Sequence, residues 1–427
     1  MNGLGHTLVQ VPPGVQCFVG EEARRRRAIE DRVVRVFEGW DYEEIIPPLF
    51  DYADVFASRA LAPRTYSFVG RDGSLLALRP DFTSLLAKIA AGRLRDRPAP
   101  IRLYYSGEVL RYEPPKAGRQ SELYQMGLEH LGGESALADA EVLAVAAECL
   151  ASLDVRGWVL ALGHVGAFGG LTAELIGVNL EALRERVEGK DPVGVREVLE
   201  AGRAPEALVA AIVQLTSLAG DATVLEEAAH AFAFCAPALA AVDELRRTVR
   251  TLSEAGLGAQ VTIDLGEVRG LDYYTGLVFR AYAPGLGFEV GGGGRYDTLL
   301  ARFGRPMPAV GFMLGLDRVA LLLDRQGTAA PPPVAEVEVV DGDDAGQTLL
   351  RARMRREAGV RVRVGRVAGG EAAERSPIHS GEAERGSWEC DAAPQGTTTE
   401  RSPIHSGEAE RGSGGCDAAP PRQEKLG

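Results

Sequence analysis

The sequence predicts an α+β fold in which a helical insertion interrupts one domain built from strands and helices. Three observations predict this fold class. Strand and helix signals alternate up to about residue 166, the segment 167–258 is almost wholly helical in pattern, and strand signals return between 259 and 325. Because two mixed segments bracket an all-helical one, we expect one discontinuous α+β domain over 1–166 and 259–325, with 167–258 inserted between its halves.

Composition places the chain among ordinary globular proteins. Its 427 residues allow two or three domains, and its apolar content of 45% and charged content of 25% are typical of soluble proteins. A net charge of -13 disfavours general affinity for nucleic acid, which needs clustered lysine and arginine. Five scattered cysteines without a C-x-x-C pair favour a reducing compartment and no structural zinc. Without a visible export signal or membrane-spanning run, we expect a cytoplasmic protein with no metal site.

The first predicted helix covers residues 21–40, where Ile29, Val33, Val36 and Phe37 recur at three- and four-residue spacing. Acidic residues at its start suit the helix dipole, and a glycine lies near its end. A strand follows in "YEEIIPP", where two prolines stop it. The chain therefore opens with a helix and a short strand.

Residues 101–129 predict two strands joined by a turn, because "PPKAG" between them cannot continue a ladder. The period of two puts Gln125, Gly127 and Glu129 on one face of the second strand, opposite a face of apolar and aromatic residues. A solvent-facing side is the simplest explanation of that polar face. A ligand-binding side is the alternative, and the rest of the chain bears on the choice.

A helix is predicted around residues 133–153, and several more follow between 167 and 258. Strand signals return in "AQVTIDLG", "LVFRAYA" and "GFEVGGG", and an apolar run then predicts a helix from about 311 to 325. Four consecutive glycines are predicted to follow a strand in this stretch, but they match neither the P-loop nor the dinucleotide fingerprint. We therefore expect no cofactor, and a flat glycine wall beside a bound molecule.

The character of the chain changes after residue 325. A proline-rich linker, "QGTAAPPPVA", precedes a segment with the pattern of one small β-α-β unit, so 326–370 is predicted to be a linker with such a remnant unit. The stretch "ERSPIHSGEAERGS" occurs twice in the remaining residues, which are poor in large apolar side chains. Such a composition buries little surface, so we expect 371–427 to be disordered and dispensable.

Two of the four clusters with chemical potential lie in the first half of the chain. In "LRPDFTSLLAK", Asp81 and Thr83 can both accept hydrogen bonds from an ammonium group, although either alone also suits a helix N-cap. Arg111 ends the first strand of the pair, and Glu113 lies two residues on, on the same face. These residues offer both signs of charge beside the polar face of the second strand.

The other two clusters lie between residues 267 and 323. Tyr273 and Tyr274 follow Arg269 in "EVRGLDYYTGLVF", beside glycines that let a ligand approach the backbone; an aromatic hairpin edge is the alternative. Arg318 lies in an apolar helical run, where a guanidinium needs an anionic partner or a route to water. None of the clusters resembles a nucleophile–base triad. Together they suit binding of an amino acid and a polyphosphate better than covalent catalysis.

Several of these stretches resemble the motifs of a known family. "RYEPPKAGRQSELYQMGLEH" resembles the second signature motif of class II aminoacyl-tRNA synthetases, in the form found in histidyl-tRNA synthetase. "RGLDYYTGLVF" is similar to that family's histidine-recognition motif, and "GGGGRYD…GFMLGLDR" to its third motif. Helix 21–40 with "YEEIIPP" resembles its first motif, a dimer element. The resemblance, over residues 10–325, implies an antiparallel sheet flanked by helices and self-association as a dimer.

Carried over residue by residue, the resemblance implies a histidine pocket and a set of remnant nucleotide or anion contacts. The residues implied to bind histidine are Asp81, Thr83, Gln125, Glu129, Tyr273 and Tyr274. The residues implied to contact a nucleotide or anion are Arg111, Glu113, Arg269 and Arg318. The polar face of the second strand would then face a ligand, with Gly127 making room between its two polar neighbours.

Departures from the synthetase pattern imply that the chain resembles the family's non-catalytic members, the regulatory subunits of ATP phosphoribosyltransferase. The chain has "VPPGVQ" and "RPDFT" where the synthetase usually has Arg-Gly-Thr and Arg-Pro-Glu-Gly-Thr, and Ser121 where it usually has a second arginine. One β-α-β fragment stands where the synthetase carries an anticodon-binding domain. The resemblance therefore implies no catalytic residues, the short-form catalytic subunit of ATP phosphoribosyltransferase as partner, histidine as feedback ligand, and no binding of tRNA.

The retained Arg111, Arg269 and Arg318 leave two enzymatic alternatives open. One is a divergent histidyl-tRNA synthetase that activates histidine with ATP and charges tRNA. The other is a free-standing amino-acid-activating enzyme that modifies another acceptor. Histidine-dependent exchange between ATP and pyrophosphate separates both alternatives from a regulatory protein.

Overall fold

The computed structural model describes residues 11–59, 61–112, 120–133, 135–268, 273–328, 337–342 and 344–365. The chain divides into two compact units, Met1–Val334 and Ala335–Gly427, which are described separately. The division does not separate 167–258 from the residues around it, so the predicted boundaries inside the first unit stay predictions.

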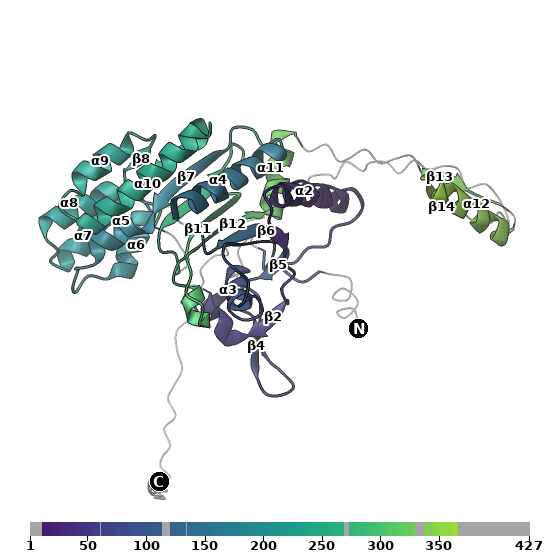
Figure 1. The fold of residues 1–427 in the computed structure, drawn as a ribbon, viewed down its shortest axis with the longest axis horizontal. Helices are drawn as coiled ribbons and strands as arrows, with labels where there is room; N and C mark the ends of the chain where they lie inside the picture. Colours follow the sequence, from purple (N-terminus) through teal and green to yellow (C-terminus); the bar gives the residue numbers. More distant parts are fainter. Residues whose placement is uncertain are drawn as a thin grey trace, which may run out of the picture. The chain divides into compact units, whose positions relative to one another are not determined.

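A nine-stranded mixed sheet forms the centre of the first unit as the structure describes it (Figure 1). Its pairs are antiparallel except β1 with β5 and β7 with β9, which are parallel. This arrangement confirms the predicted α+β class; the sheet is mainly antiparallel, with these two parallel pairs. In spatial order the strands are β1 (Glu43–Glu44), β5 (Ile101–Leu110), β6 (Glu122–Leu131), β12 (Ala309–Gly315), β11 (Gly291–Arg295), β10 (Leu277–Tyr282), β7 (Val159–His164), β9 (Val261–Asp264) and β8 (Ala219–Gly220).

Helices α2 (Gly20–Gly39), α4 (Ser135–Ser152) and α11 (Leu316–Gln326) pack on one face of this sheet (Figure 1). The apolar positions that predict the first helix are its buried ones, and Phe37 packs edge-on against Phe312 of β12 at 5.9 Å between ring centroids. Side chains of β6 at even positions, such as Met126 and Leu128, belong to this core. The odd positions of β6 therefore face the other side of the sheet.

The second face of the sheet carries a smaller sheet and a helix. The smaller sheet has the order β2 (Phe50–Tyr52), β4 (Leu75–Leu78), β3 (Ser67–Val69), and α3 (Thr83–Ala91) follows it in the chain. Arg79 fastens this layer to β5, because its guanidinium donates to the backbone carbonyl of Glu108 at 2.6 Å and to that of Pro47 at 2.9 Å. Short 3₁₀ turns complete this layer, Ala53–Phe56, Ala62–Arg64 and Leu300–Phe303, and a further one, Gly258–Gln260, leads into β9.

The segment predicted as a helical insertion consists largely of helices, with the two-residue strand β8 at the edge of the main sheet (Figure 1). Local caps explain where two of its helices begin: Asn179 accepts from the backbone of Ala182 at 3.1 Å, and Asp191 from that of Gly194 at 2.8 Å. The helices are α5 (Val165–Thr172), α6 (Leu180–Glu188), α7 (Pro192–Ala201), α8 (Glu206–Leu215), α9 (Val224–Ala231) and α10 (Ala236–Glu254).

Two sequence predictions near the end of this unit are wrong. The predicted helix from 311 to 325 is divided between strand β12 and helix α11, which begins only at Leu316. An apolar run without alternation does not distinguish a buried strand from a helix, and here burial on both faces favours the strand. The four glycines do not follow a strand but form most of β11 itself.

The second unit contains a β-α-β arrangement within the residues that the structure describes. Strands β13 (Val337–Val340) and β14 (Arg361–Val364) pair in parallel, and α12 (Ala345–Glu357) connects them. This confirms the unit that the sequence predicts. The repeat tail over 371–427 and most of the proline-rich linker lie outside the described residues. In the described part of the chain, no helix has the length and apolarity needed to cross a membrane.

Candidate functional site

A cavity of 340 Å³ lies on the second face of the main sheet, between its central strands and the layer that contains α3. Its walls come from segments that are far apart in the sequence but adjacent in the sheet, including β6, β12, β11 and β10. The predicted residues that line it are Asp81, Thr83, Arg111, Gln125, Glu129, Tyr273 and Tyr274. The fold thus brings together all six residues predicted to bind histidine.

The centre of this cavity is the carboxyl group of Glu129, which is 2% exposed. Thr83 donates a hydrogen bond to its Oε1 at 2.7 Å, and the Tyr296 hydroxyl donates to its Oε2. Among the described residues Glu129 forms no ion pair, so burial dominates and raises its pKa to about 8, against the two hydroxyl donors. A buried carboxyl group held by hydroxyls alone can pair with a cationic or N–H-bearing ligand.

Gly311 on β12 makes this position of Glu129 available. The two residues are directly opposite in the register of β12 and β6, and a Cβ atom on Gly311 would lie 1.7 Å from Oε2 of Glu129. Any side chain at Gly311 would therefore displace the carboxyl group. Sequence reasoning missed Gly311, because its reason for being glycine depends on a strand pairing between residues that are far apart in the sequence.

Gly127 has a different role from the one predicted. A Cβ atom there would lie 2.5 Å from the Tyr105 hydroxyl and 2.5 Å from the backbone carbonyl of Phe312. The space between Gln125 and Glu129 is thus filled by Tyr105 of β5 and is not left open for a ligand. The correction follows from cross-strand packing, since Tyr105 is the direct partner of Gly127.

Asp81 combines the two alternatives that the sequence leaves open. Its Oδ2 accepts from the Ser84 hydroxyl at 3.1 Å and from the Ser84 backbone at 3.4 Å, so one oxygen acts as a weak cap of α3. Its Oδ1 is buried and has no hydrogen-bond partner among the residues that the structure describes. Burial raises the pKa of Asp81, while the charge of Arg111 and the Ser84 hydrogen bonds oppose this. The second oxygen is an acceptor for a ligand donor.

Aromatic rings enclose the remaining sides of the carboxyl pair. Tyr273 packs edge-on against Tyr274 at 5.2 Å and against Tyr296 at 5.7 Å between centroids. Tyr105 stacks on Phe82 at 4.1 Å. Gln125 is 4% exposed on the same face of β6 as the carboxyl group. The result is a pocket with aromatic walls that match a planar ring and with carboxyl and amide groups that can accept hydrogen bonds.

The predicted anion contacts are only partly in place. Arg111 lines the cavity, and its Nε donates to the carbonyl of Pro80 at 2.7 Å. Arg318 is not among the lining residues; its Nη1 donates to Oε1 of Glu289 at 2.6 Å and to the Glu289 carbonyl at 2.9 Å. Glu113 and Arg269 lie outside the described residues.

Sequence reasoning missed three charged residues at the other end of the cavity. Arg280 of β10 pairs with Glu267 at 2.8 Å and with Glu289 at 3.4 Å, and all three line the cavity. The signal was an arginine in the otherwise apolar strand "LVFRAY", which requires a carboxylate nearby. Its partners could not be chosen from the sequence because they lie on separate loops.

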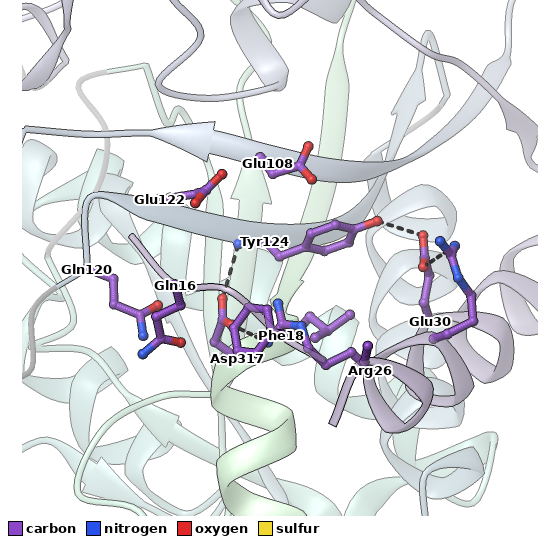
Figure 2. Close-up of a pocket in the computed structure, with 12 residues that line it drawn as sticks. Gln16, Phe18, Arg26, Glu30, Glu108, Gln120, Glu122, Tyr124 and Asp317 are labelled. Atoms are coloured by element: carbon purple, nitrogen blue, oxygen red, sulfur yellow. Dashed lines mark hydrogen bonds and ion pairs between the residues drawn. The ribbon is translucent and has the colours of Figure 1, made fainter. Parts of the chain in front are cut away.

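A second cavity of 280 Å³ lies on the opposite face of β5 and β6, beside α2 and the start of α11 (Figure 2). Glu30 accepts from Arg27 at 2.6 Å and from the Tyr124 hydroxyl at 2.8 Å, and Asp317 pairs with Arg26. None of the predicted site residues in the described part of the chain lines this cavity. In the same part, no group of three or more His, Cys, Asp and Glu side chains could hold a metal ion.

Comparison with known proteins agrees with this geometry. The family model of histidyl-tRNA synthetase matches residues 14–319. An ATP phosphoribosyltransferase regulatory subunit of Desulforamulus reducens is 39% identical over 346 residues, 80% of this chain and 86% of the relative. One from Moorella thermoacetica is 38% identical over 383 residues, 88% and 96% of the two chains. A solved Bacillus halodurans structure, described as an ATP phosphoribosyltransferase regulatory subunit/histidyl-tRNA synthetase, superposes with a TM-score of 0.73 at 28% identity, covering 84% of this chain and 92% of that one.

The fold and the matched region define a class II aminoacyl-tRNA synthetase-like protein of the histidyl-tRNA synthetase type. Within that class, the chain belongs to the family of ATP phosphoribosyltransferase regulatory subunits. The motif resemblance is thereby confirmed, and the reading as a divergent synthetase is less supported.

Proposed function

We propose that this chain is a non-catalytic regulatory subunit that assembles with the short-form catalytic subunit of ATP phosphoribosyltransferase and supports its activity. The observation that carries the proposal is family membership at 38–39% identity, over at least 80% of this chain. Relatives described as regulatory subunits imply a catalytic partner subunit, and in this proposal that partner carries out the phosphoribosyl transfer. The predicted absence of catalytic residues is consistent with this division of work.

The cavity around Glu129 supports histidine as the regulatory ligand. The free oxygen of Asp81 and the Thr83 hydroxyl suit an α-ammonium group, and the Glu129 carboxyl group suits an imidazole N–H. Tyr273 and Tyr274 would enclose the ring. In this proposal Gln125 supplies an amide for the remaining polar atoms of the amino acid.

Histidine would regulate the assembly by binding its two states with different affinity. A ligand shifts an equilibrium only by its differential affinity, so the inhibited complex must bind histidine more tightly than the active one. Reciprocity then requires that the catalytic subunit change the affinity of this chain for histidine. The first motif, in α2 and β1, is proposed as the element through which two copies of this chain associate.

The test is reconstitution from purified subunits. Phosphoribosyl transfer to ATP is measured with the catalytic subunit alone, with this chain alone, and with both, over a range of histidine concentrations. We expect activity only in the mixture and its loss on addition of histidine. A catalytic subunit that is fully active alone and unaffected by this chain would overturn the proposal.

A synthetase-like activity is the second candidate, and the retained Arg111 and Arg318 are the observation behind it. Arg318 is already engaged by a carboxylate, which weakens this candidate. We expect no histidine-dependent exchange between ATP and pyrophosphate from protein that binds histidine. Exchange, with or without charging of tRNA, would favour the enzymatic alternatives.

A further inference from the structure

We propose that Glu289 closes one end of the cavity to phosphate-bearing anions, by holding the two guanidinium groups that would otherwise bind them. The end in question is formed by Glu267, Arg280 and Glu289, with Arg318 behind Glu289. The inference concerns what the cavity rejects, and it does not depend on whether the chain regulates a partner.

One carboxylate oxygen lies between two guanidiniums. Oε1 of Glu289 is 2.6 Å from Nη1 of Arg318 and 3.4 Å from Nη1 of Arg280. This is the position that an oxygen of a bound phosphate would take between two arginines. A protein carboxylate thus stands where a ligand anion would stand.

Backbone geometry holds Glu289 in this position. The Glu289 carbonyl accepts from the same Nη1 of Arg318 at 2.9 Å, so Arg318 binds both the backbone and the side chain of Glu289. The ring of Phe288 lies 5.5 Å from the Arg318 guanidinium and covers it. Burial acts to raise the pKa of Glu289, but the hydrogen bond from Arg318 and the nearby guanidinium charges lower it, so the group is ionised at neutral pH.

Arg280 would otherwise be open to a ligand. It is directly opposite Gly292 in the pairing of β10 with β11, so no side chain of the neighbouring strand covers it. Its Nε is 2.8 Å from Oε2 of Glu267, whose Oε1 is buried and has no hydrogen-bond partner in the described part of the chain. Two carboxylates therefore balance two guanidiniums, and the set has no net charge to attract a polyphosphate.

Removal of the Glu289 charge should reverse this balance. Glu289→Gln leaves two guanidiniums beside one carboxylate, with the same side-chain length. Since the freed guanidinium groups can donate charge-assisted hydrogen bonds to the anion, we expect a gain in affinity for inorganic tripolyphosphate of about tenfold or more. Glu267→Gln frees only Arg280 and should give a smaller gain.

The experiment is calorimetric titration of sodium tripolyphosphate into the full chain, in magnesium-free buffer of fixed ionic strength. Glu200→Gln is the matched control, because Glu200 is an exposed partner of Arg196 and its loss changes net charge equally. We expect Glu289→Gln to bind tripolyphosphate, and we expect the wild type and the Glu200→Gln control to bind it at least about tenfold more weakly. Addition of Arg318→Ala to Glu289→Gln should abolish the gain.

Two results would overturn the proposal: wild type that binds tripolyphosphate as tightly as Glu289→Gln, or Glu289→Gln that matches the Glu200→Gln control. Thermal unfolding of each variant shows whether it is folded. If Glu289→Gln does not fold, Glu267→Gln decides, and no gain there is likewise contrary to the proposal.

Discussion

The two faces of the β5–β6 strand pair carry similar side chains in opposite electrostatic situations. On the helix-covered face, Glu30 forms an ion pair with Arg27. Asp317 forms one with Arg26 (Figure 2). On the other face, Glu129 has hydroxyl donors and no ion pair among the described residues. Glu30 and Glu129 each lie beside a cavity, and each accepts a hydrogen bond from a tyrosine hydroxyl. They differ in that Glu30 has an arginine partner, whereas Glu129 has none among the described residues.

The presence or absence of a cationic partner distinguishes a structural carboxylate from one that can bind a ligand. A carboxylate that already has its arginine gains little from a ligand, whereas a buried carboxyl group without a cation has its desolvation uncompensated until one arrives. The same reasoning distinguishes the two ends of the cavity around Glu129, where Glu267 and Glu289 are paired with arginines and Glu129 itself has no such partner among the described residues. The unpaired group therefore identifies the ligand-binding end.

Glu129→Ala should have the largest effect on histidine binding. The substitution removes an acceptor that would bond a ligand N–H, and a hydrogen bond to a charged group contributes about 1.5–3 kcal/mol, so calorimetry should show a loss of about tenfold to a hundredfold in affinity. Glu30→Ala is the matched control on the opposite face and should leave affinity within about twofold while lowering stability by about 1–3 kcal/mol. Equal losses of affinity in both variants would break the comparison between the two faces.

Much of this comparison could be predicted from the sequence. The period of two assigned Gln125 and Glu129 to one face of a strand, and the structure confirms that face. The spacing in residues 21–40 predicted the helix that covers the other face. Both are local patterns, in which each residue's neighbours along the chain determine its environment.

The remainder depends on contacts between distant residues. Tyr296 lies 167 positions from Glu129, whose carboxyl group it contacts, so no local pattern connects them. The helix predicted from 311 failed because an uninterrupted apolar run carries no period, and the true strand there pairs on both sides. The glycines of β11 were predicted as a wall, but their place inside a strand depends on the same pairing.

Gly311→Ala should have the next largest effect, through Glu129. The added methyl group would overlap Oε2 of Glu129 and lie 2.6 Å from the backbone carbonyl of Leu128, so the carboxyl group must move. Overpacking of this kind costs about 1–3 kcal/mol, and we expect histidine affinity to fall by about tenfold with the fold retained. The control is Gly169→Ala in α5, where an added Cβ meets nothing within 4 Å. Unchanged affinity in Gly311→Ala would show that the position of Glu129 is not critical.

A further difference between the two faces should be a pH dependence of stability that belongs to one face only. Folding raises the pKa of Glu129 from 4.5 to about 8, so the folded state retains a proton that the unfolded state releases. Its contribution is fully present below pH 4.5 and is lost as the pH rises through 8. Stability of the wild type relative to Glu129→Gln should therefore decline between these values, by up to about 1.4 kcal/mol per pH unit.

Thermal unfolding midpoints of the two proteins, measured without histidine from pH 5.5 to 8, test this decline. Groups other than Glu129 titrate in both proteins, so their contributions cancel in the difference. Saturating histidine should flatten the difference, because a bound cationic or N–H donor favours the ionised carboxylate. Parallel midpoint curves in the empty proteins would mean that Glu129 is ionised in the fold, and hence that its face resembles the paired one.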